Sequence, residues 1–346
     1  MGKRRLSWVF IILVLSCLCF SGMAVGATSA AKVHFIDVGQ ADSIYIQLPN
    51  HIDVLIDGGN EADSKTVVDY LKAQKVDDIE LMIATHPHED HIGGLPAVLK
   101  AFKVEEIIDS GKDATSKIYK TYAADALAEG CPWVEDAYQT KTWGTTALKI
   151  LTGNETWNDI NDYSVVCRLD TGNIEFLFTG DAETPVEKIL KGDISADILK
   201  IGHHGSTSST SPNFLSKVNP RVAVICVGAG NTYGHPAAST ITKLKNAGIA
   251  IYRTDLNSNV VIDTDGTTYS VTCTKGTPTS GQQSVQNNTT TAPSTEKNYV
   301  GSKSSDKYHL PSCTHAKKIA AENQVWFATK ADAAAAGYTP CAVCKP

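Results

Sequence analysis

Short apolar runs separated by polar turns dominate the chain from residue 33 onward. Three such runs, bounded by glycine, proline and asparagine, predict short strands at 33–37, 43–48 and 51–57. The segment 64–74 carries its apolar residues on one helical face, and 79–84 is a continuous apolar run typical of a buried strand. A meander followed by a helix and a further strand indicates a layered α/β domain.

The second half of the chain repeats the same kinds of element. Apolar runs that alternate with segments of helical spacing predict a second α/β layer, and no repeat of 20 to 50 residues is visible. The predicted strands are 147–151, 164–169, 174–179, 197–201, 222–227, 249–253, 260–263 and 268–273, and the predicted helices are 185–190, 212–218 and 236–247.

Residues 1–27 have the three parts of a secretory signal peptide. Basic residues at positions 3–5 precede an apolar run over 8–20 and a small-residue stretch that ends near Ala27. An uncleaved N-terminal anchor and a weak lipoprotein box at Cys17 are alternatives. All three interpretations place the body outside the cytoplasm, as a secreted protein or as a membrane-anchored one that faces outward.

A polar segment at 276–297, rich in Thr, Ser, Asn and Gln, has almost nothing apolar to bury. Such a composition predicts a flexible linker. The linker separates a body at 32–275 from a tail at 298–346 that has its own aromatic and cysteine residues. We therefore expect two separately folded units after the signal peptide.

Composition and charge narrow the class of protein. The 346 residues are 42% hydrophobic and 20% charged, which excludes whole-chain disorder, a fibrous repeat and a polytopic membrane protein. The net charge of -6 is unevenly distributed, because the tail carries six Lys against three acidic residues while 6–297 carry 22 basic against 34 acidic residues. An acidic body is a poor non-specific clamp for nucleic acid unless bound cations change its local field.

The cysteines do not form an obvious disulfide framework. Of nine, Cys17 and Cys19 lie in the signal segment, and the remaining seven cannot all pair internally. The four in the body are scattered singly, so packing in the core is the favoured explanation for them. They are Cys131, Cys167, Cys226 and Cys273.

A run of metal-ligand residues follows the predicted strand 79–84. His86 and His88 are expected to hold one divalent ion, while Asp90 and His91 reach a second; imidazole with carboxylate suits Zn or Mn. Asp90 is also expected to act in catalysis. The loop lies where an α/β layer presents ligands, at the carboxyl edge of its sheet.

Three further strand ends carry candidate site residues. Asp181 follows a glycine after the strand 174–179, where a carboxylate can bridge two ions. His203 and His204 follow the strand 197–201 and, because neighbouring side chains on a strand point oppositely, have different roles that the sequence does not assign. His235 precedes a helix that Pro236 can begin, and it is a candidate ligand or general acid close to an anionic substrate.

These residues resemble the metallo-β-lactamase fold family, and more narrowly the extracellular hydrolase domain of competence DNA-uptake channel proteins. The resemblance implies an αββα sandwich with a dinuclear site at one edge of the two sheets. It also implies that Asp37, Gln40, Asp42 and Ser206 contact the substrate or support the metal ligands. The motifs that carry it are 35–43, 55–59, 85–91, 178–183, 203–206 and 233–236.

Two positions depart from the family pattern. Ala41 stands where the family usually has glycine after Gln40. The broader superfamily has a histidine ligand before the bridging aspartate, whereas this chain has no histidine from 92 to 202 and has 161–164 at the expected place. One metal position is therefore expected to be weaker, or to be completed by His203 or His204.

The tail contains two pairs of potential zinc ligands. His309 and Cys313 are separated by three residues, and Cys341 and Cys344 by two. The arrangement resembles the small zinc-binding domain of the Ada-type DNA-repair methyltransferase, with His309 in place of the usual first cysteine. Structural zinc is favoured over a disulfide between Cys341 and Cys344 or with Cys313.

Together these features predict an exported hydrolase with two divalent ions, Zn or Mn, in the body and one structural zinc in the tail. The favoured activity is that of a phosphodiesterase or DNase that uses a hydroxide held by the two ions, with His235 protonating the leaving oxygen. A hydrolase of another ester, a lactone or a β-lactam is one alternative, and a catalytically weak DNA-binding protein of the competence type is another. DNA or another phosphodiester is the expected partner, with no stable protein partner and with cell-surface association through the tail or an uncleaved anchor.

Overall fold

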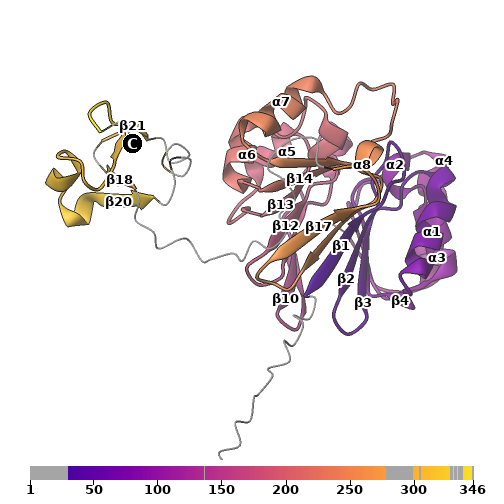
Figure 1. Cartoon of the computed structure of the whole chain (residues 1–346). Helices are drawn as coiled ribbons and strands as arrows, with labels where there is room; N and C mark the ends of the chain where they lie inside the picture. Colours follow the sequence, from indigo (N-terminus) through magenta and orange to yellow (C-terminus); the bar gives the residue numbers. More distant parts are fainter. Residues whose placement is uncertain are drawn as a thin grey trace, which may run out of the picture.

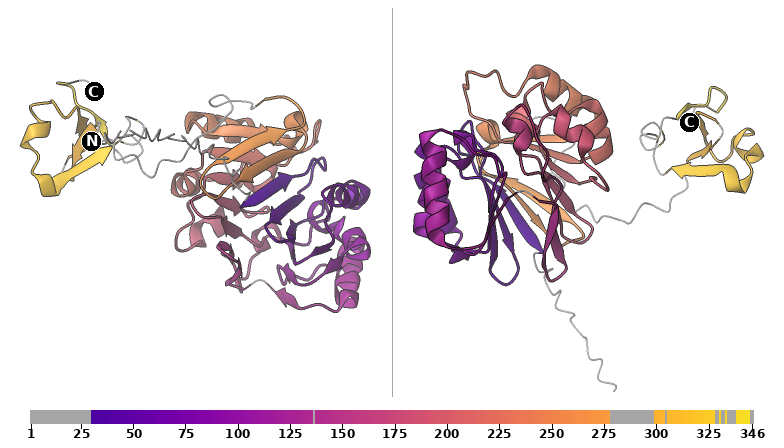
Figure 2. Two further views of the ribbon diagram at one scale, coloured as in Figure 1. Left: turned by 60° about the horizontal axis from the view of Figure 1, so that its bottom comes forward. Right: turned by 180° about the vertical axis from the view of Figure 1, so that it is seen from behind.

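Two β-sheets face each other in the body, and each carries helices on its outer side (Figures 1 and 2). The computed structural model describes residues 30–135 and 137–277 and, in the tail, 299–303, 305–327, 330, 333 and 338–344. The first sheet has the strand order β17-β16-β1-β2-β3-β5-β7-β8, and the second has the order β15-β14-β13-β12-β11-β10-β9. This arrangement is the αββα sandwich that the family resemblance implies.

The first sheet begins with the predicted meander, in which β1, β2 and β3 pair in antiparallel order. Parallel strands extend it on one side from β3 through β5 and β7 to β8, and the C-terminal hairpin of the body closes it on the other, with Phe35 opposite Val260. Its strands are β1 (Ala31–Phe35), β2 (Ile44–Leu48), β3 (Ile52–Ile56), β5 (Leu81–Ala84), β7 (Ile107–Asp109), β8 (Trp133–Glu135), β16 (Val260–Thr264) and β17 (Tyr269–Cys273).

The second sheet is antiparallel from β9 to β12 and parallel from β12 to β15. The parallel strands end at one common edge, where their loops carry the candidate ligands. The strands are β9 (Gln139–Trp143), β10 (Thr146–Ile150), β11 (Cys167–Asp170), β12 (Glu175–Phe178), β13 (Ile198–Lys200), β14 (Val222–Ile225) and β15 (Ala250–Arg253); a separate short pair joins β4 (Asp78–Ile79) to β6 (Lys103–Val104).

Helices cover both outer faces. In Figures 1 and 2, α1, α3 and α4 lie against the first sheet and α5, α6 and α7 against the second. The bounds are α1 (Ser64–Ala73), α2 (Glu89–Ile92), α3 (Leu95–Ala101), α4 (Lys117–Glu129), α5 (Thr184–Ile189), α6 (Pro212–Val218), α7 (Ala238–Asn246) and α8 (Thr254–Asn257), with single 3₁₀ turns η1 (Glu61–Asp63), η2 (Asn161–Tyr163) and η3 (Gly202–Gly205).

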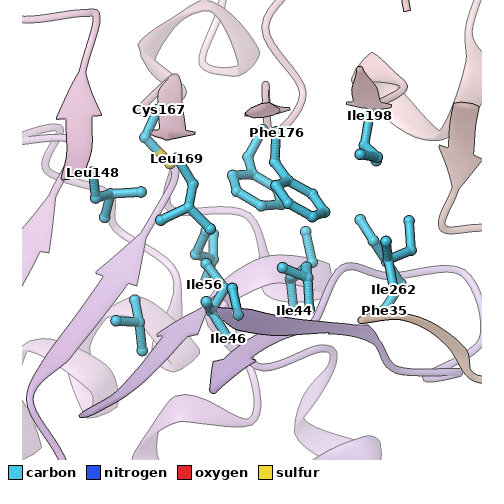
Figure 3. Close-up of a cluster of buried hydrophobic side chains, with 14 of the residues drawn as sticks. Phe35, Ile44, Ile46, Ile56, Leu148, Cys167, Leu169, Phe176, Ile198 and Ile262 are labelled. Atoms are coloured by element: carbon cyan, nitrogen blue, oxygen red, sulfur yellow. The ribbon is translucent and has the colours of Figure 1, made fainter. Parts of the chain in front are cut away.

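The main core lies between the two sheets (Figure 3). Phe35 and Ile44 of the first sheet face Phe176 and Ile198 of the second, and all four side chains are buried. Two further apolar clusters fill the spaces between each sheet and its helices. The strands are therefore apolar on both faces, which explains why they appear in the sequence as continuous hydrophobic runs.

Most predicted elements are confirmed within a few residues, but the elements between residues 92 and 146 were not predicted. This segment contains α3, α4 and β7 to β9, for which the sequence analysis predicted nothing. In α4, only Tyr122 and Ala126 are buried, so its apolar stripe is weak. The predicted strand 79–84 is interrupted at Glu80, whose carboxylate accepts a hydrogen bond from the backbone of Asp53.

The tail forms its own small sheet with the order β20-β18-β19-β21. Its elements are β18 (Tyr299–Ser302), β19 (Lys307–His309), β20 (Gln324–Phe327), β21 (Thr339–Pro340), η4 (Ala316–Lys318) and η5 (Ala321–Asn323). The predicted signal peptide and the linker from residue 278 onward lie outside the described residues. Within the described ranges, no helix is both long and apolar enough to cross a membrane.

No disulfide joins the cysteines in the part of the chain that the structure describes. Cys167 and Cys226 are buried, as expected for core residues, whereas Cys131 and Cys273 are partly exposed. Core packing therefore accounts fully for only two of the four body cysteines.

Candidate metal centre

The candidate ligands gather where the loops after β5, β12 and β13 meet. Asp90, His91, Asp181 and His204 each offer one ligand atom, and these four atoms all lie within 4.8 Å of one another. His91 Nε2 is 3.3 Å from Asp181 Oδ2, and His204 Nε2 is 3.3 Å from Asp90 Oδ2 and 3.5 Å from Asp181 Oδ2. Two imidazoles and two carboxylates around one point form a ligand set suited to Zn or Mn.

The imidazole of His91 is oriented from behind by Asp57. His91 Nδ1 lies 2.7 Å from Asp57 Oδ2, and the same carboxylate accepts hydrogen bonds from the backbone and the hydroxyl of Thr85 at 2.8 and 2.7 Å. Because Nδ1 is held by Asp57, the ring turns Nε2 toward Asp181. A carboxylate behind a ligating histidine fixes the ring in this way at many metal sites.

His204 is oriented in the same manner by a backbone carbonyl. Its Nδ1 lies 2.8 Å from the carbonyl oxygen of Cys226, at the end of the neighbouring strand β14, so Nε2 faces Asp90 and Asp181. This placement brings His204, rather than His203, into the ligand group.

His86 and His88 form a second pair beside the first group. His86 Nε2 is 3.0 Å from His88 Nδ1, and the ring centroids of His86 and His91 are 4.1 Å apart. Two nitrogens this close can share one ion. His86 Nδ1 lies within 3.2 Å of Thr85 Oγ1 and 3.4 Å of Ser164 Oγ, which leaves Nε2 available.

Ser164 belongs to the segment 161–164, where the sequence analysis expected a histidine from the superfamily pattern. Its hydroxyl oxygen accepts a hydrogen bond from the backbone of Asp181 at 3.0 Å and lies beside His86. The His86–His88 pair therefore offers two imidazoles, and within the described residues these two side chains do not join the four-residue ligand group. Gly180, at φ 51°, makes the turn that brings Asp181 here, and a Cβ at this glycine would lie 3.0 Å from Ser164.

His203 contacts a different carboxylate. The two histidines follow β13 as predicted, but they lie in η3 with positive φ values of 46° and 50°, so the alternation of side chains along a strand does not apply to them. The turn still separates the two rings. His203 Nδ1 is 2.9 Å from Glu183 Oε1, and its Nε2 is 3.8 Å from Asp181 Oδ2.

His235 lies outside the ligand group but next to it. Its ring centroid is 5.6 Å from that of His203, and burial lowers the pKa of its imidazole. The predicted helix 236–247 is observed as α7, which begins at Ala238, slightly after Pro236; the peptide bond between His235 and Pro236 is cis.

Charges within the centre strongly affect one another. Burial alone would raise the pKa of Asp181, but His204 and His91 hold it well below its usual value. Burial alone would lower the pKa of His91, yet Asp181, Asp57 and Asp90 raise it well above its usual value. The pKa of His86 is held well below its usual value by burial and by His91. An arriving cation would displace the proton of His91 and find His86 already neutral.

Two buried atoms indicate that the protein alone does not complete this centre. Within the described residues, His91 Nε2 and Asp181 Oδ1 are buried without a hydrogen-bond partner. Buried polar groups without partners are rare in folded proteins, and an ion bound by His91 and Asp181 would give these groups a partner. The residues present therefore fit a metal centre.

The other predicted site residues surround the ligands. Asp42 is buried and contacts Lys200, and its Oδ1 is 3.4 Å from His204 Nδ1. Gln40 accepts a hydrogen bond from the backbone of Gly228 at 3.1 Å. Asp37 and Ser206 lie farther out: the backbone amide of Asp37 donates to the side chain of Asn259, and the Ser206 hydroxyl lies 2.8 Å from that of Ser208.

The sequence analysis did not identify three residues that contact or orient the candidate ligands and their neighbours. They are Asp57, which orients His91; Glu183, which orients His203; and Lys200, which contacts Asp42. Asp57 and Glu183 lie within quoted motifs, and Lys200 is a charged residue at the end of an apolar strand. A charge in such a position is a usable signal, because a buried charge needs a partner.

The tail holds a separate cluster. The ligand atoms of His309, Cys313, Cys341 and Cys344 all lie within 4.8 Å of one another, and His309 Nδ1 is 3.6 Å from Cys313 Sγ. Hydrogen bonds from the backbone amides of Cys344 and Val343 lower the pKa of the Cys341 thiol. Three thiols and one imidazole form a closed ligand set of the structural zinc type.

Comparison with known proteins agrees with both clusters. Residues 36–229 match the metallo-beta-lactamase superfamily, and residues 282–346 match the metal binding domain of Ada. The ComE operon protein 3 of Bacillus subtilis is 29% identical over 277 residues, and competence protein ComA of Neisseria gonorrhoeae is 31% identical over 253 residues. These alignments cover 73% and 71% of this chain but only 34% of each relative, so the chain spans about a third of their length.

Among solved structures, a diphosphatase from the PhnP family aligns with 68% of this chain and 99% of its own, at 13% identity and a TM-score of 0.42. The family match extends over more than half of the chain and includes the ligand loops after β5, β12 and β13. The chain belongs to the metallo-beta-lactamase superfamily of hydrolases, with an Ada-type metal-binding domain in its tail.

Proposed function

We propose that this protein hydrolyses phosphodiester bonds in DNA outside the cytoplasm. The observation that carries the proposal is the pairing of two ion positions: Asp90, His91, Asp181 and His204 at one, and His86 with His88 beside it. Bound divalent ions at such a pair lower the pKa of water and neutralise charge on a phosphoryl oxygen. The names of the competence relatives support DNA as the polymer.

The chain's own residues would position and protonate the reacting groups. Asp181 is fully buried and directs Oδ2 toward the imidazoles of both His91 and His204, so it holds the ligand group together. His203, oriented by Glu183, and His235 lie in a row on one side of this group. A proton held on His235 could pass to the oxygen that leaves the phosphorus, as expected for a general acid within reach of the substrate.

Because the body is acidic, we expect it to bind a DNA substrate only when divalent ions occupy the metal centre. Residues 6–297 carry 34 acidic against 22 basic side chains, which repel a phosphate backbone at long range. Ions bound at the centre reverse the charge where the scissile phosphate must lie. The basic tail adds a second attractive region, and we propose that it helps to hold the polymer.

The test is hydrolysis of single-stranded and duplex DNA by the full chain loaded with Mn²⁺ or Zn²⁺. Asp181→Asn and Asp90→Asn should each lower kcat by at least a hundredfold while the far-UV spectrum stays unchanged. The matched control is Asp69→Asn, on the exposed face of α1, which should behave as the wild type. Cleavage of a lactone or a β-lactam without cleavage of DNA would contradict the proposal, as would tight ion binding without any turnover.

A further inference from the structure

Tyr233 presents its aromatic ring to solvent beside the metal centre. Tyr233 is 72% exposed, and few large apolar side chains in the described structure are exposed. The ring is stacked on that of His235, with centroids 5.9 Å apart and planes inclined by 19°. His235 in turn lies 5.6 Å from His203.

Ring contacts continue from this exposed tyrosine into the ligand group. The centroids of His203 and His204 are 6.2 Å apart, and those of His204 and His91 are 5.5 Å apart. Tyr233 is therefore separated from the metal ligand His204 by only two intervening rings. This row of ring contacts leads from the solvent-exposed Tyr233 to the ligand group.

The loop that carries Tyr233 is fixed by one side chain. Asn231 accepts hydrogen bonds from the backbone amides of Tyr233 at 3.2 Å and His235 at 3.0 Å. The same side chain donates to the carbonyl oxygens of Gly228 at 3.0 Å and His235 at 2.6 Å. The backbone beneath the exposed ring is thus held in place before any ligand arrives.

Hydrogen bonds connect both ends of this loop to the motifs that surround the candidate ligands. At the start, the amide of Gly228 donates to Gln40, and a Cβ at Gly228 would lie only 2.5 Å from the backbone nitrogen of Gln40, so the contact requires glycine. At the end, the amide of Ala237 donates to the carbonyl of Gly205, directly after His204. The position of Tyr233 relative to the metal ligands is therefore set by the fold.

We propose that Tyr233 is a nucleobase-binding subsite, on which an unpaired base next to the scissile phosphate stacks. The proposal rests on the proposed phosphodiesterase function. Every base has a face that stacks on an aromatic ring, so such a platform binds single strands without reading their sequence. Bases in a duplex are already stacked on their neighbours, so the subsite favours single-stranded DNA or strand ends. A ring fixed in advance binds at a lower entropic cost.

The experiment compares a short oligothymidylate with an abasic oligonucleotide of equal length, using the full chain with Mn²⁺. Tyr233→Ala should raise KM for the oligothymidylate about tenfold or more and leave kcat within about twofold, since stacking binds the base and not the reacting atoms. KM for the abasic strand should not change. Tyr233→Phe and Tyr233→Trp should keep the wild-type KM, and Leu127→Ala, an exposed apolar residue on α4, is the matched surface control.

A 2-aminopurine base next to the scissile position reports stacking directly through its fluorescence. A purely structural role of Tyr233 would not change this signal. The fluorescence of the base should be quenched on binding to the wild type and to Tyr233→Trp, but not to Tyr233→Ala. If the wild type cleaves neither strand, the phosphodiesterase proposal fails, and the same oligonucleotides then test the subsite alone through their Kd. The subsite proposal is wrong if Tyr233→Ala weakens binding of the oligothymidylate and of the abasic strand equally. It is also wrong if Tyr233→Ala changes the binding of neither strand.

Discussion

The ammonium group of Lys200 contacts the carboxylate of Asp42, and neither side chain is more than 1% exposed. The same ammonium donates to the carbonyl oxygen of Gly180 at 2.8 Å and lies 3.7 Å from Asp181 Oδ1. Burial alone would lower the pKa of Lys200, but Asp42 and Asp181 raise it, so the lysine stays charged. This ion pair joins the first motif of the chain to the loop that carries Asp181.

Replacing either Lys200 or Asp42 alone should lower the free energy of unfolding much more than replacing both. Lys200→Met leaves Asp42 as an unpaired buried charge, and removal of one partner from a buried pair typically destabilises a protein by about 3–5 kcal/mol. Lys200→Met with Asp42→Asn removes both charges and should recover much of that loss. Denaturant unfolding of the wild type, both single variants and the double variant measures the coupling. Additive free energies would show that the contact contributes nothing.

Asp57→Asn tests whether the residue behind His91 controls ion affinity. The amide can still occupy the space, but it presents a weaker acceptor to His91 Nδ1 and disturbs the hydrogen bonds from Thr85. Loss of such a supporting carboxylate lowers metal affinity by about 10–100-fold. Titration of the metal-free protein with Mn²⁺ or Zn²⁺ should show this drop at one of the two positions. Unchanged affinity at both would remove Asp57 from the metal centre.

His34 should make the body less stable in mild acid. The side chain is buried beside Tyr45 and Tyr70, and burial lowers its pKa from 6.5 to about 4. Between these values the unfolded chain binds a proton that the folded chain does not, so the stabilisation is complete above pH 6.5 and falls as the pH drops toward 4. The full difference is about 3 kcal/mol.

The measurement for His34 is the free energy of unfolding at pH 7.5 and pH 4.5. His34→Gln cannot titrate and should lose less stability than the wild type between these two conditions. Because other groups also titrate, only the difference between the two proteins is diagnostic. An identical pH slope in both would show that the pKa of His34 is the same in the folded and unfolded chains.

Candidate ligands could be proposed from the sequence because they stand at strand ends with informative local spacing. His86, His88, Asp90 and His91 occupy one short loop, and a ligand-rich loop after an apolar strand is informative without knowledge of the tertiary fold. The same holds for the tail, where two ligand pairs form one cluster. The meander and the parallel strands were predicted from hydrophobic runs for the same local reason.

What the sequence could not predict depends on contacts between distant segments. Asp57 lies 34 residues before His91, and Lys200 lies far along the chain from Asp42; only the paired sheets bring them together. The roles of His203 and His204 were undecided because a turn with positive φ, rather than a strand, directs the two rings. The helix α4 was missed since it buries few apolar residues and depends on the sheet beneath it.

The tail should affect binding of long DNA and not the chemical step. Removal of residues 277–346 takes away a net charge of +3 and should raise KM for a long strand at low salt, while kcat for a short oligonucleotide stays unchanged. Because the attraction is electrostatic, the difference should shrink as salt rises. Cys341→Ser in the full chain is the companion variant, since it keeps every lysine of the tail but breaks the ligand cluster.

The two variants separate the effect of charge from the effect of folding in the tail. If zinc organises the tail into the surface that binds DNA, Cys341→Ser should raise KM nearly as much as the truncation does, because the ion supplies much of the folding free energy of such a small domain. If charge alone suffices, Cys341→Ser should retain the wild-type KM. Should both variants bind long DNA at low salt as the wild type does, the tail is not a DNA-holding domain, and attachment to an anionic cell surface becomes the role to test.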